Sequence, residues 1–423
     1  MAENGILGYI VPSKFTKVGA GKKLRELLAE KEYLNSIVSF GANQVFADKT
    51  TYTCLLILNK KPQKTFQYGE VKSLKSWKIR EPEAVKYALK RTKELDSEVW
   101  VLVTPELTNA HNKIVSQSIK LNDLVGNDNI FNGIQTSAND VYIFIPTRED
   151  KKRYYFTKKG IDYKIEKEIT KPYFQTSSGE DNLYTYRTFK PNARVIYPYV
   201  TTKTGVDIIP LTNIQKKFPL AYGYLQKHKT ILNNPKRDIK PEPKTKTEWH
   251  RYGRHQSLDS CGLPSKIIVG VLSVGDKYAI DIHGTLISSG GTAGYCVVAI
   301  PTDSDYSIYY IQAILNSKYL EWFSALYGEI FRGGYIARGT KVLKNLPIRK
   351  INFTNSKEKA LHDKIVETQI ELISIYDQID ANVGNKRALT PLQGQFVREK
   401  ANLEKLLAKL YDLGSDDLLI PLI

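Results

Sequence analysis

The chain has 423 residues, 42% of them hydrophobic, so it can bury two or three domain cores and is not a disordered basic tail. It carries 62 Lys and Arg residues against 44 Asp and Glu residues, and the formal charge of +18 favours a polyanionic partner, of which nucleic acid is the commonest. No stretch resembles a transmembrane span, a signal peptide or a basic amphipathic anchor, which argues against a membrane partner. The alternative is that the charge only keeps the protein in solution.

Cysteine and histidine are sparse. The three cysteines, Cys54, Cys261 and Cys296, lie far apart in or near apolar runs, which predicts reduced core thiols in a cytoplasmic protein and not a disulfide framework. The six histidines show no zinc-ligand spacing, and no Cys-x-x-Cys occurs. We therefore predict no metal site.

The first sixty residues have the pattern of a sheet with one helix. An apolar run at 6–11 ends at Pro12 and predicts a buried strand, and leucines at helical spacing predict a helix over 20–30. Two further strands are expected at 36–40 and 51–58, on either side of a polar turn. This order predicts the closing part of an α/β sheet, and such a sheet needs more strands than this chain supplies.

Three stretches of this region resemble adenine-specific DNA methyltransferases. Residues 5–15 (GILGYIVPSKF) resemble the family's late strand-and-turn motif, residues 21–28 (GKKLRELL) the helix after it, and residues 45–58 (VFADKTTYTCLLIL) the final hairpin of the catalytic domain. The resemblance implies that Phe46 stacks on an adenine extruded from the duplex, where its ring replaces lost base stacking. It also makes Lys49 an expected DNA contact. The alternative is that Phe46 fills the core beneath the hairpin.

The catalytic motifs of that family do not occur in this sequence. The family binds S-adenosylmethionine on a glycine-rich loop after the first strand and holds the target amine with an Asn/Asp-Pro-Pro-Tyr/Phe tetrapeptide. The nearest string, residues 233–236 (NNPK), lacks the second proline and the aromatic residue. We therefore expect this chain alone to bind no cofactor and to transfer no methyl group. The resemblance implies S-adenosylmethionine only for the complete enzyme.

A second resemblance begins at residue 132. Residues 132–144 (NGIQTSANDVYIF) combine a polar turn with an alternating strand and resemble the start of the TaqI-like specificity domain of type II restriction-modification enzymes. The amide and hydroxyl groups of Gln135, Thr136 and Ser137 suit a phosphate or a base edge. An ordinary turn before a strand explains them equally well.

Further candidates for DNA contacts are arginines beside aromatic residues. Arg194 lies in a stretch of mixed cations and aromatics. Such a stretch can bind nucleic acid, or it can be a strand whose tyrosines cover the edge of the core. Residues 249–256 (WHRYGRHQ) resemble a family segment that precedes a strand. Arg251 and Arg254 are candidate DNA contacts there, and we assign Trp249 to the core.

Two glycine-dense segments, 284–296 and 330–338, allow the backbone to approach a bulky partner closely. We expect paired strands at 276–289 and 294–300 around the first of them. Small residues, hydroxyls and guanidinium groups on such a frame suit a phosphate chain and base edges. The expected DNA contacts in these segments are Ser289, Gly290, Gly291, Thr292, Arg332, Gly333 and Arg338.

The rest of the chain supplies supporting elements. A strand is expected at 98–104, one long helix at 309–327 and a closing strand at 341–348, the last two resembling elements of the specificity domain. The tail has two amphipathic helical patterns, the second of them starting at Thr390-Pro391, with the threonine as cap and the proline in the first turn.

Together these features predict a mixed α/β and α+β chain. Its expected parts are the end of a Rossmann-like methyltransferase sheet (1–60), a connector (61–130), a TaqI-like DNA specificity domain (131–350) and a carboxy-terminal helical pair (351–423).

The predicted function is sequence-specific recognition of double-stranded DNA for adenine methylation in a prokaryotic restriction-modification system. One alternative is a split methyltransferase, active when a separate upstream chain completes the sheet. Another is an RNA-binding or structural subunit.

Overall fold

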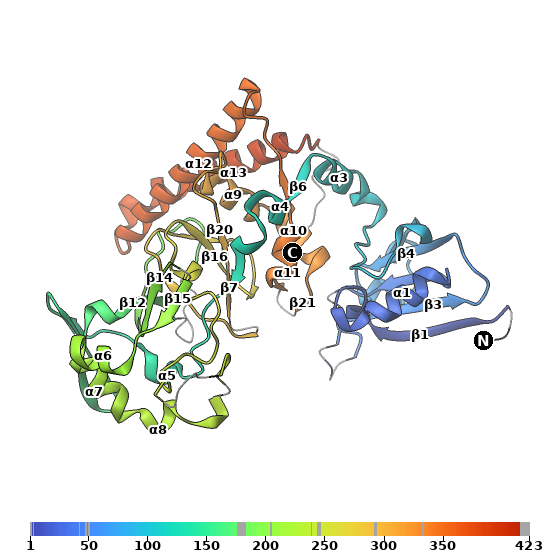
Figure 1. The fold of residues 1–423 in the computed structure, drawn as a ribbon. Helices are drawn as coiled ribbons and strands as arrows, with labels where there is room; N and C mark the ends of the chain where they lie inside the picture. The colour runs from blue at the N-terminus through green and yellow to red at the C-terminus, as the bar shows by residue number, and fades with distance from the viewer. Residues whose placement is uncertain are drawn as a thin grey trace. The chain divides into compact units, whose positions relative to one another are not determined.

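The structure of the chain, a computed structural model, describes residues 2, 4–41, 43–46, 49, 51–175, 183–203, 205–237, 239–242, 247–291, 294–331 and 334–414. The fold of the chain is drawn in Figure 1. The chain divides into two compact units. Unit 1 comprises Met1–Leu121, Ser317–Asn352 and Glu404–Ile423, and unit 2 comprises Asn122–Asn316 and Phe353–Leu403. No helix within the described ranges is long and apolar enough to cross a membrane.

Unit 1 is built on a five-stranded sheet with the order β1-β3-β2-β4-β5. Strand β3 is antiparallel to both β1 and β2, whereas β2 and β4 are parallel. The elements of the sheet and the helices between them are β1 Ile6–Pro12, α1 Lys22–Glu30, β2 Leu34–Ser39, β3 Thr53–Asn59, β4 Thr65–Val71, α2 Leu74–Lys78 and β5 Val85–Arg91. The remaining elements of the unit are α3 Pro105–Ser116, β6 Ser118–Lys120, α10 Lys318–Tyr327, β21 Ile330–Phe331, β22 Tyr335–Ala337, α11 Thr340–Lys344 and β23 Pro347–Arg349.

The two faces of this sheet are covered unequally. On one face α1 packs through Leu28 onto a core that includes Phe15 and Trp100. A much smaller cluster lies on the other face, and there α2 covers the sheet only near Phe40 and Val71. On β1, an edge strand of the sheet, Ile6 is 69% and Ile10 is 45% exposed. These exposed apolar side chains give the β1 end the character of an interface.

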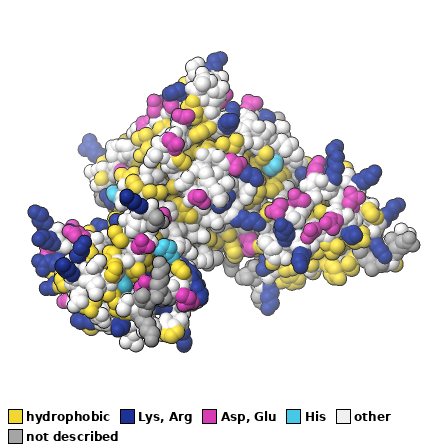
Figure 2. Space-filling model, in the orientation of Figure 1, with side chains coloured by type: hydrophobic (Ala, Val, Ile, Leu, Met, Phe, Trp, Pro, Cys, Tyr) yellow, Lys and Arg dark blue, Asp and Glu magenta, His cyan; other side chains and the backbone are white. Residues whose placement is uncertain are grey.

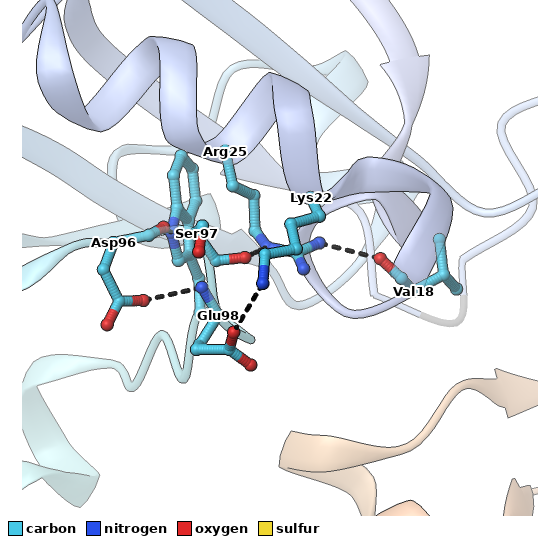
Figure 3. Close-up of polar contacts among 7 residues, drawn as sticks. Val18, Lys22, Arg25, Asp96, Ser97 and Glu98 are labelled. Atoms are coloured by element: carbon cyan, nitrogen blue, oxygen red, sulfur yellow. Dashed lines mark hydrogen bonds and ion pairs between the residues drawn. The ribbon is translucent and has the colours of Figure 1, made fainter.

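The turn that carries α1 is fixed by a buried arginine (Figure 3). The Arg25 guanidinium donates hydrogen bonds to the carbonyl oxygens of Phe15, Val18 (2.9 Å) and Ser97 (3.0 Å). Nearby Lys22 forms an exposed ion pair with Glu98. The buried arginine therefore satisfies backbone carbonyls that no strand pairs, and it joins the segment around residue 97 to the start of α1.

In unit 1 the first predicted strands and helix are present, but β1 is not buried as predicted, since Ile6, Tyr9 and Ile10 are exposed. Three further expectations are wrong. Residues 98–104 form no strand. The Trp100 side chain turns into the core, and the Trp100 backbone N–H donates to the Thr16 carbonyl instead of to a neighbouring strand. The long helix over 309–327 is broken, since the Ser317 hydroxyl caps a new helix at the Leu320 N–H. The closing strand begins late, because residues 340–344 form a helix and only Pro347–Arg349 is extended.

Unit 2 contains several small sheets around one continuous hydrophobic core. Two of them are four-stranded, with the orders β18-β16-β20-β7 and β19-β12-β13-β8, and a third has the order β11-β10-β9. The first part of the unit contains α4 Leu121–Val125, β7 Ile130–Asn132, α5 Asn139–Tyr142, β8 Ile143–Phe144, β9 Arg148–Glu149, β10 Arg153–Lys158, β11 Ile161–Glu166, β12 Thr170–Phe174, β13 Ala193–Ile196, β14 Tyr199–Thr202 and β15 Gly205–Ile208. The rest contains α6 Leu211–Lys217, α7 Pro219–Lys227, α8 Lys229–Leu232, β16 Lys266–Gly270, β17 Leu272–Ser273, β18 Ala279–Asp281, β19 Leu286–Ile287, β20 Tyr295–Ala299, α9 Ile308–Leu315, α12 Ser356–Ala381 and the part of α13 Lys386–Leu410 that precedes residue 404.

The glycine-rich region does not form the predicted pair of strands. Strands β18 and β20 both pair with β16, one on each side, and β19 joins a different sheet by pairing in parallel with β12. The alternating strand expected before residue 144 is also wrong in its first part. Residues 139–142 form the short helix α5, and both Val141 and Tyr142 enter the core.

The two tail helices are confirmed, although the second starts earlier than predicted. Helix α13 begins at Lys386, where the Asn385 side chain accepts a hydrogen bond from the Ala388 N–H. Pro391 lies inside the helix, and the Thr390 hydroxyl bonds to the Lys386 carbonyl. The Thr390-Pro391 pair is therefore an interior feature and not a cap.

Candidate nucleic-acid interface

Three loop segments that are far apart in the sequence meet in unit 2. They are residues 133–137, 251–256 and 286–291, and we call their meeting point the loop junction. Backbone hydrogen bonds join the first segment to the other two. They are Ile134 N–H to Ile287 O (2.8 Å), Ser289 N–H to Ile134 O (2.7 Å), Gly253 N–H to Thr136 O (2.9 Å) and Arg254 N–H to Gln135 O (3.1 Å). The backbone therefore holds the junction, which leaves side chains available for other contacts.

Two glycines allow this close approach. A Cβ atom at Gly133 would lie 2.2 Å from the carbonyl oxygen of Ile287, and one at Gly253 would lie 1.8 Å from the hydroxyl oxygen of Ser137. No side chain larger than hydrogen fits at either position without moving the neighbouring segment. Glycine is therefore required for steric reasons at these two positions.

A buried arginine joins the parts of the junction. Arg237 is 8% exposed, and its guanidinium donates to the carbonyl oxygens of Thr136 (3.0 Å), Arg251 (2.6 Å), Trp249 (3.1 Å) and Leu232. A charged donor makes stronger hydrogen bonds than a neutral one, and four acceptors on one planar group fix their mutual positions. The sequence gives little sign of this role, because the segment around Arg237 has the composition of a charged loop.

A second buried charge positions the glycine-rich segment. Lys266 and Asp281 are fully buried and form an ion pair of 2.5 Å. The Asp281 carboxylate also accepts hydrogen bonds from the backbone N–H (2.7 Å) and hydroxyl (2.9 Å) of Thr285. The pair therefore fixes the chain just before residues 286–291. Its lysine and aspartate are fifteen residues apart and carry no motif that would predict it.

Several predicted contact residues lie on the accessible side of the junction. Ser137 is exposed and has a positive φ of 53°, and Gln135, Arg254 and Ser289 are half-buried. Gly290 and Gly291 are exposed, and a Cβ atom at either would have no atom within 4 Å. The structure thus brings hydroxyl, amide and guanidinium groups together with bare backbone, although the segment at 133–137 is more than a hundred residues from the other two in sequence.

Three other predicted contacts are buried and already have partners. The Thr136 hydroxyl bonds to the Asn139 side chain (2.5 Å) and accepts from the Ala138 N–H. Arg251 forms an ion pair with Glu248 (3.0 Å), and Arg338, which is in unit 1, forms one with Glu321 (2.5 Å). Burial removes these side chains from a partner's reach, so they support neighbouring elements and we leave them out of the proposed contact set.

The remaining predicted residues lie away from the junction or outside the described residues. Arg194 is half-buried on β13, with its guanidinium 4.8 Å from the ring centre of Tyr154. In unit 1, Phe46 is 44% exposed and Lys49 is exposed, and the hydrophobic cluster beneath this turn contains Val45 and not Phe46. The ring of Phe46 is therefore available for contact and does not fill the core. Thr292, Arg332 and Gly333 lie outside the described residues.

The sequence patterns did not single out a basic hairpin in unit 2. Nine Lys and Arg residues against five Asp and Glu residues occur between positions 148 and 171, which include strands β9 to β11. Figure 2 shows Lys and Arg side chains gathered over this part of the unit. We call residues 148–171 the basic hairpin; its exposed lysines that form no ion pair with another described residue are Lys151, Lys152, Lys159, Lys164 and Lys171.

One lysine of the basic hairpin has an unusual environment. Burial lowers the pKa of Lys158 to about 8, although Asp140 opposes this shift. Its ammonium group donates to the Ile143 carbonyl (2.6 Å). Among the residues that the structure describes, no cluster of three or more His, Cys, Asp or Glu side chains could hold a metal ion.

Comparison with known proteins shows what this chain is similar to. Residues 1–46 match the Eco57I restriction-modification methylase family. Over 422 residues, all of this chain is 46% identical to the type II restriction enzyme and methyltransferase RM.Eco57I of Escherichia coli. The chain is therefore similar to type II restriction-modification enzymes. It covers 42% of RM.Eco57I.

Two more distant restriction-modification proteins are also similar. The type II methyltransferase M.BstVI of Geobacillus stearothermophilus is 22% identical over 405 residues, which are 90% of this chain and 64% of that protein. The solved structure of the type IIL restriction-modification enzyme MmeI in complex with DNA is 11% identical, with a TM-score of 0.53 over 98% of this chain and 48% of that chain. The likeness to MmeI shows a shared mixed α/β fold. The chain spans less than two thirds of the length of both curated relatives.

Replacing Arg237 tests whether the loop junction depends on its guanidinium. Arg237→Met leaves buried carbonyl oxygens without donors, so we expect the free energy of unfolding of unit 2 to fall by about 2–4 kcal/mol. Arg398→Met is the matched control, because Arg398 is an exposed arginine of unit 2 on α13. The measurement is a urea titration in which hydrogen exchange of unit 2 peptides reports unfolding. Equal free energies of unfolding for Arg237→Met and the unmodified chain would contradict the role assigned to Arg237.

Proposed function

We propose that this chain is part of a restriction-modification protein and that its unit 2 binds double-stranded DNA in a sequence-specific manner, with the loop junction as its recognition surface. The supporting observation is that three segments predicted from sequence as DNA-contacting lie together and present Gln135, Ser137, Arg254, Ser289 and Gly290 on their accessible side. Amide and guanidinium groups recognise base edges, and bare backbone allows a phosphate to come close.

The basic hairpin supplies the phosphate contacts in this proposal. Its exposed lysines are flexible cations, which neutralise phosphates without reading sequence. The junction and the hairpin therefore have separate roles, because the first contributes specificity and the second contributes affinity. The three buried free cysteines suit a reducing compartment, and we place the protein in the prokaryotic cytoplasm.

The second candidate function is methyl transfer by a complete enzyme of which this chain forms part. The β1 edge and the exposed apolar residues Ile6 and Ile10 support it, because they suit the addition of further strands and a covering layer. In this candidate the five-stranded sheet is the end of a Rossmann-like methyltransferase sheet. The segment or chain that completes it holds S-adenosylmethionine, since this sequence contains neither the family's cofactor loop nor its tetrapeptide.

Phe46 would be the residue of this chain closest to the chemistry in the second candidate. Its exposed ring, on a turn held by the Lys49 N–H to Phe46 carbonyl bond (3.2 Å), suits stacking on an extruded adenine. Because the ring is outside the core, it can be replaced without a loss of stability.

Salt-dependent binding tests the first candidate. We expect the chain to bind duplex DNA with an affinity that falls steeply with salt. The triple variant Lys152→Ala, Lys159→Ala, Lys164→Ala should reduce the slope of log K against log salt by about 0.9 for each phosphate that it no longer neutralises. Lys357→Ala with Lys386→Ala is the control, since both lysines are exposed on the tail helices. Fluorescence anisotropy with duplex DNA and duplex RNA measures the slopes. Failure to bind DNA at low salt, or a preference for RNA, would refute the proposal.

Methyl transfer with and without a complementing methyltransferase segment tests the second candidate. We expect adenine methylation only when this chain and the complementing segment are mixed. Phe46→Ala should lower the methylation rate, whereas binding of this chain to intact duplex and its melting temperature should stay unchanged, because the ring would act only on an extruded base. Phe46→Trp is the conservative control and should retain most of the rate. Equal rates for Phe46→Ala and the unmodified chain would exclude the stacking role.

A further inference from the structure

A pocket of about 460 Å³ opens in unit 2 between the loop junction and the basic hairpin. Such a volume is within the range of about 300–1,000 Å³ that ligand sites commonly have. Phe144, Tyr173 and Tyr295 line it with aromatic rings, and all three are buried. The polar residues that line it are Asn139, Asp140, Thr157, Lys158, Gln175 and Ser288. Lys158 belongs to the hairpin and Ser288 to the junction, so the pocket adjoins both proposed DNA-binding features.

Two amide residues of the pocket are held in place by their neighbours. The side-chain oxygen of Asn139 accepts from the Thr136 hydroxyl (2.5 Å), which leaves its NH₂ group as a donor. The backbone of Gln175 bonds twice to the Asn192 side chain, through its N–H (2.8 Å) and its carbonyl (2.6 Å), while its own side chain is exposed. The Asn139 amide, held in this way, loses little freedom when it binds a partner, whereas only the backbone of Gln175 is held.

The charges and the apolar rim add chemical selectivity. Asp140 is exposed at the pocket, and Lys158, whose ammonium group bonds to the Ile143 carbonyl, carries the opposite charge. Ile145 lines the same pocket and is 58% exposed, which is unusual for a large aliphatic side chain. A carboxylate that only accepts, amides that both donate and accept, and an apolar side chain are the groups that distinguish bases in the major groove.

We propose that this pocket reads base edges of the DNA target, with Asp140 and Gln175 as specificity-determining residues. Asp140 would accept a hydrogen bond from the exocyclic amine of cytosine or adenine, Gln175 would pair with an adenine edge, and Ile145 would contact a thymine methyl group. The inference rests on the proposed DNA-binding function and extends it to residues that the sequence did not indicate.

Selection from a library of randomised duplexes tests the inference. The unmodified chain, Asp140→Asn and Gln175→Ala are each used to enrich bound duplexes, which are then sequenced. Asp128→Asn and Gln215→Ala are the matched controls, because both residues are exposed in unit 2 and neither lines the pocket. All four replaced side chains are exposed, so the variants should melt at the same temperature as the unmodified chain.

We expect each pocket variant to change the base preference at one position of the enriched site by about ten-fold or more, while affinity for unselected duplex at low salt stays the same. The controls should enrich the same site as the unmodified chain. An unchanged site for both pocket variants, with clear enrichment by the unmodified chain, would overturn this inference and leave the proposed DNA binding intact. No enrichment by the unmodified chain would instead refute sequence-specific binding itself.

Discussion

The hydrogen bonds from the buried Arg237 guanidinium to four backbone carbonyls are the interaction on which the shape of the loop junction depends. They join residues 136, 232, 249 and 251 at one point, and the backbone bonds of Ile134 then attach the glycine-rich segment. A guanidinium is always charged and presents its donors in a fixed plane, so it can fix several loops that share no sheet. The contact surface thereby gains a defined shape without using the side chains that we propose to meet DNA.

Burial divides the predicted contact residues into two functional groups. Side chains that end inside the unit, such as Thr136 and Arg251, set the position of the loops through internal partners. Those that stay accessible, such as Ser137 and Arg254, can meet a ligand. Residues of both kinds alternate along the same short segments. A substitution at one of the buried positions would therefore alter DNA binding indirectly, through the geometry of its neighbours, and weaker binding alone would not identify a residue that touches DNA.

Local patterns predicted the elements whose stability is local, and they failed where tertiary contacts decide. The first strands, α1 and the tail helices follow from apolar spacing, and Trp249 is buried as expected. The strand at 98–104 failed because Trp100 enters the core, and the paired strands around the glycines failed because β19 pairs with β12. At the site, glycines and hydroxyls singled out three segments that lie together in the structure. Arg237, the Lys266–Asp281 pair and the pocket around Asp140 depend on contacts between distant residues, which spacing along the chain does not encode.

Photo-cross-linking to duplex DNA that carries 5-iodouracil, with mass spectrometry of the linked peptides, tests the central claim most directly. We expect the cross-links to fall in unit 2, within residues 133–137, 251–256 and 286–291 and in the basic hairpin. We also expect Arg237→Met to disperse the links from the three loop segments while those to the hairpin remain. Cross-links confined to unit 1 or to helices α12 and α13, with none at the loop junction, would contradict the claim that the junction recognises DNA.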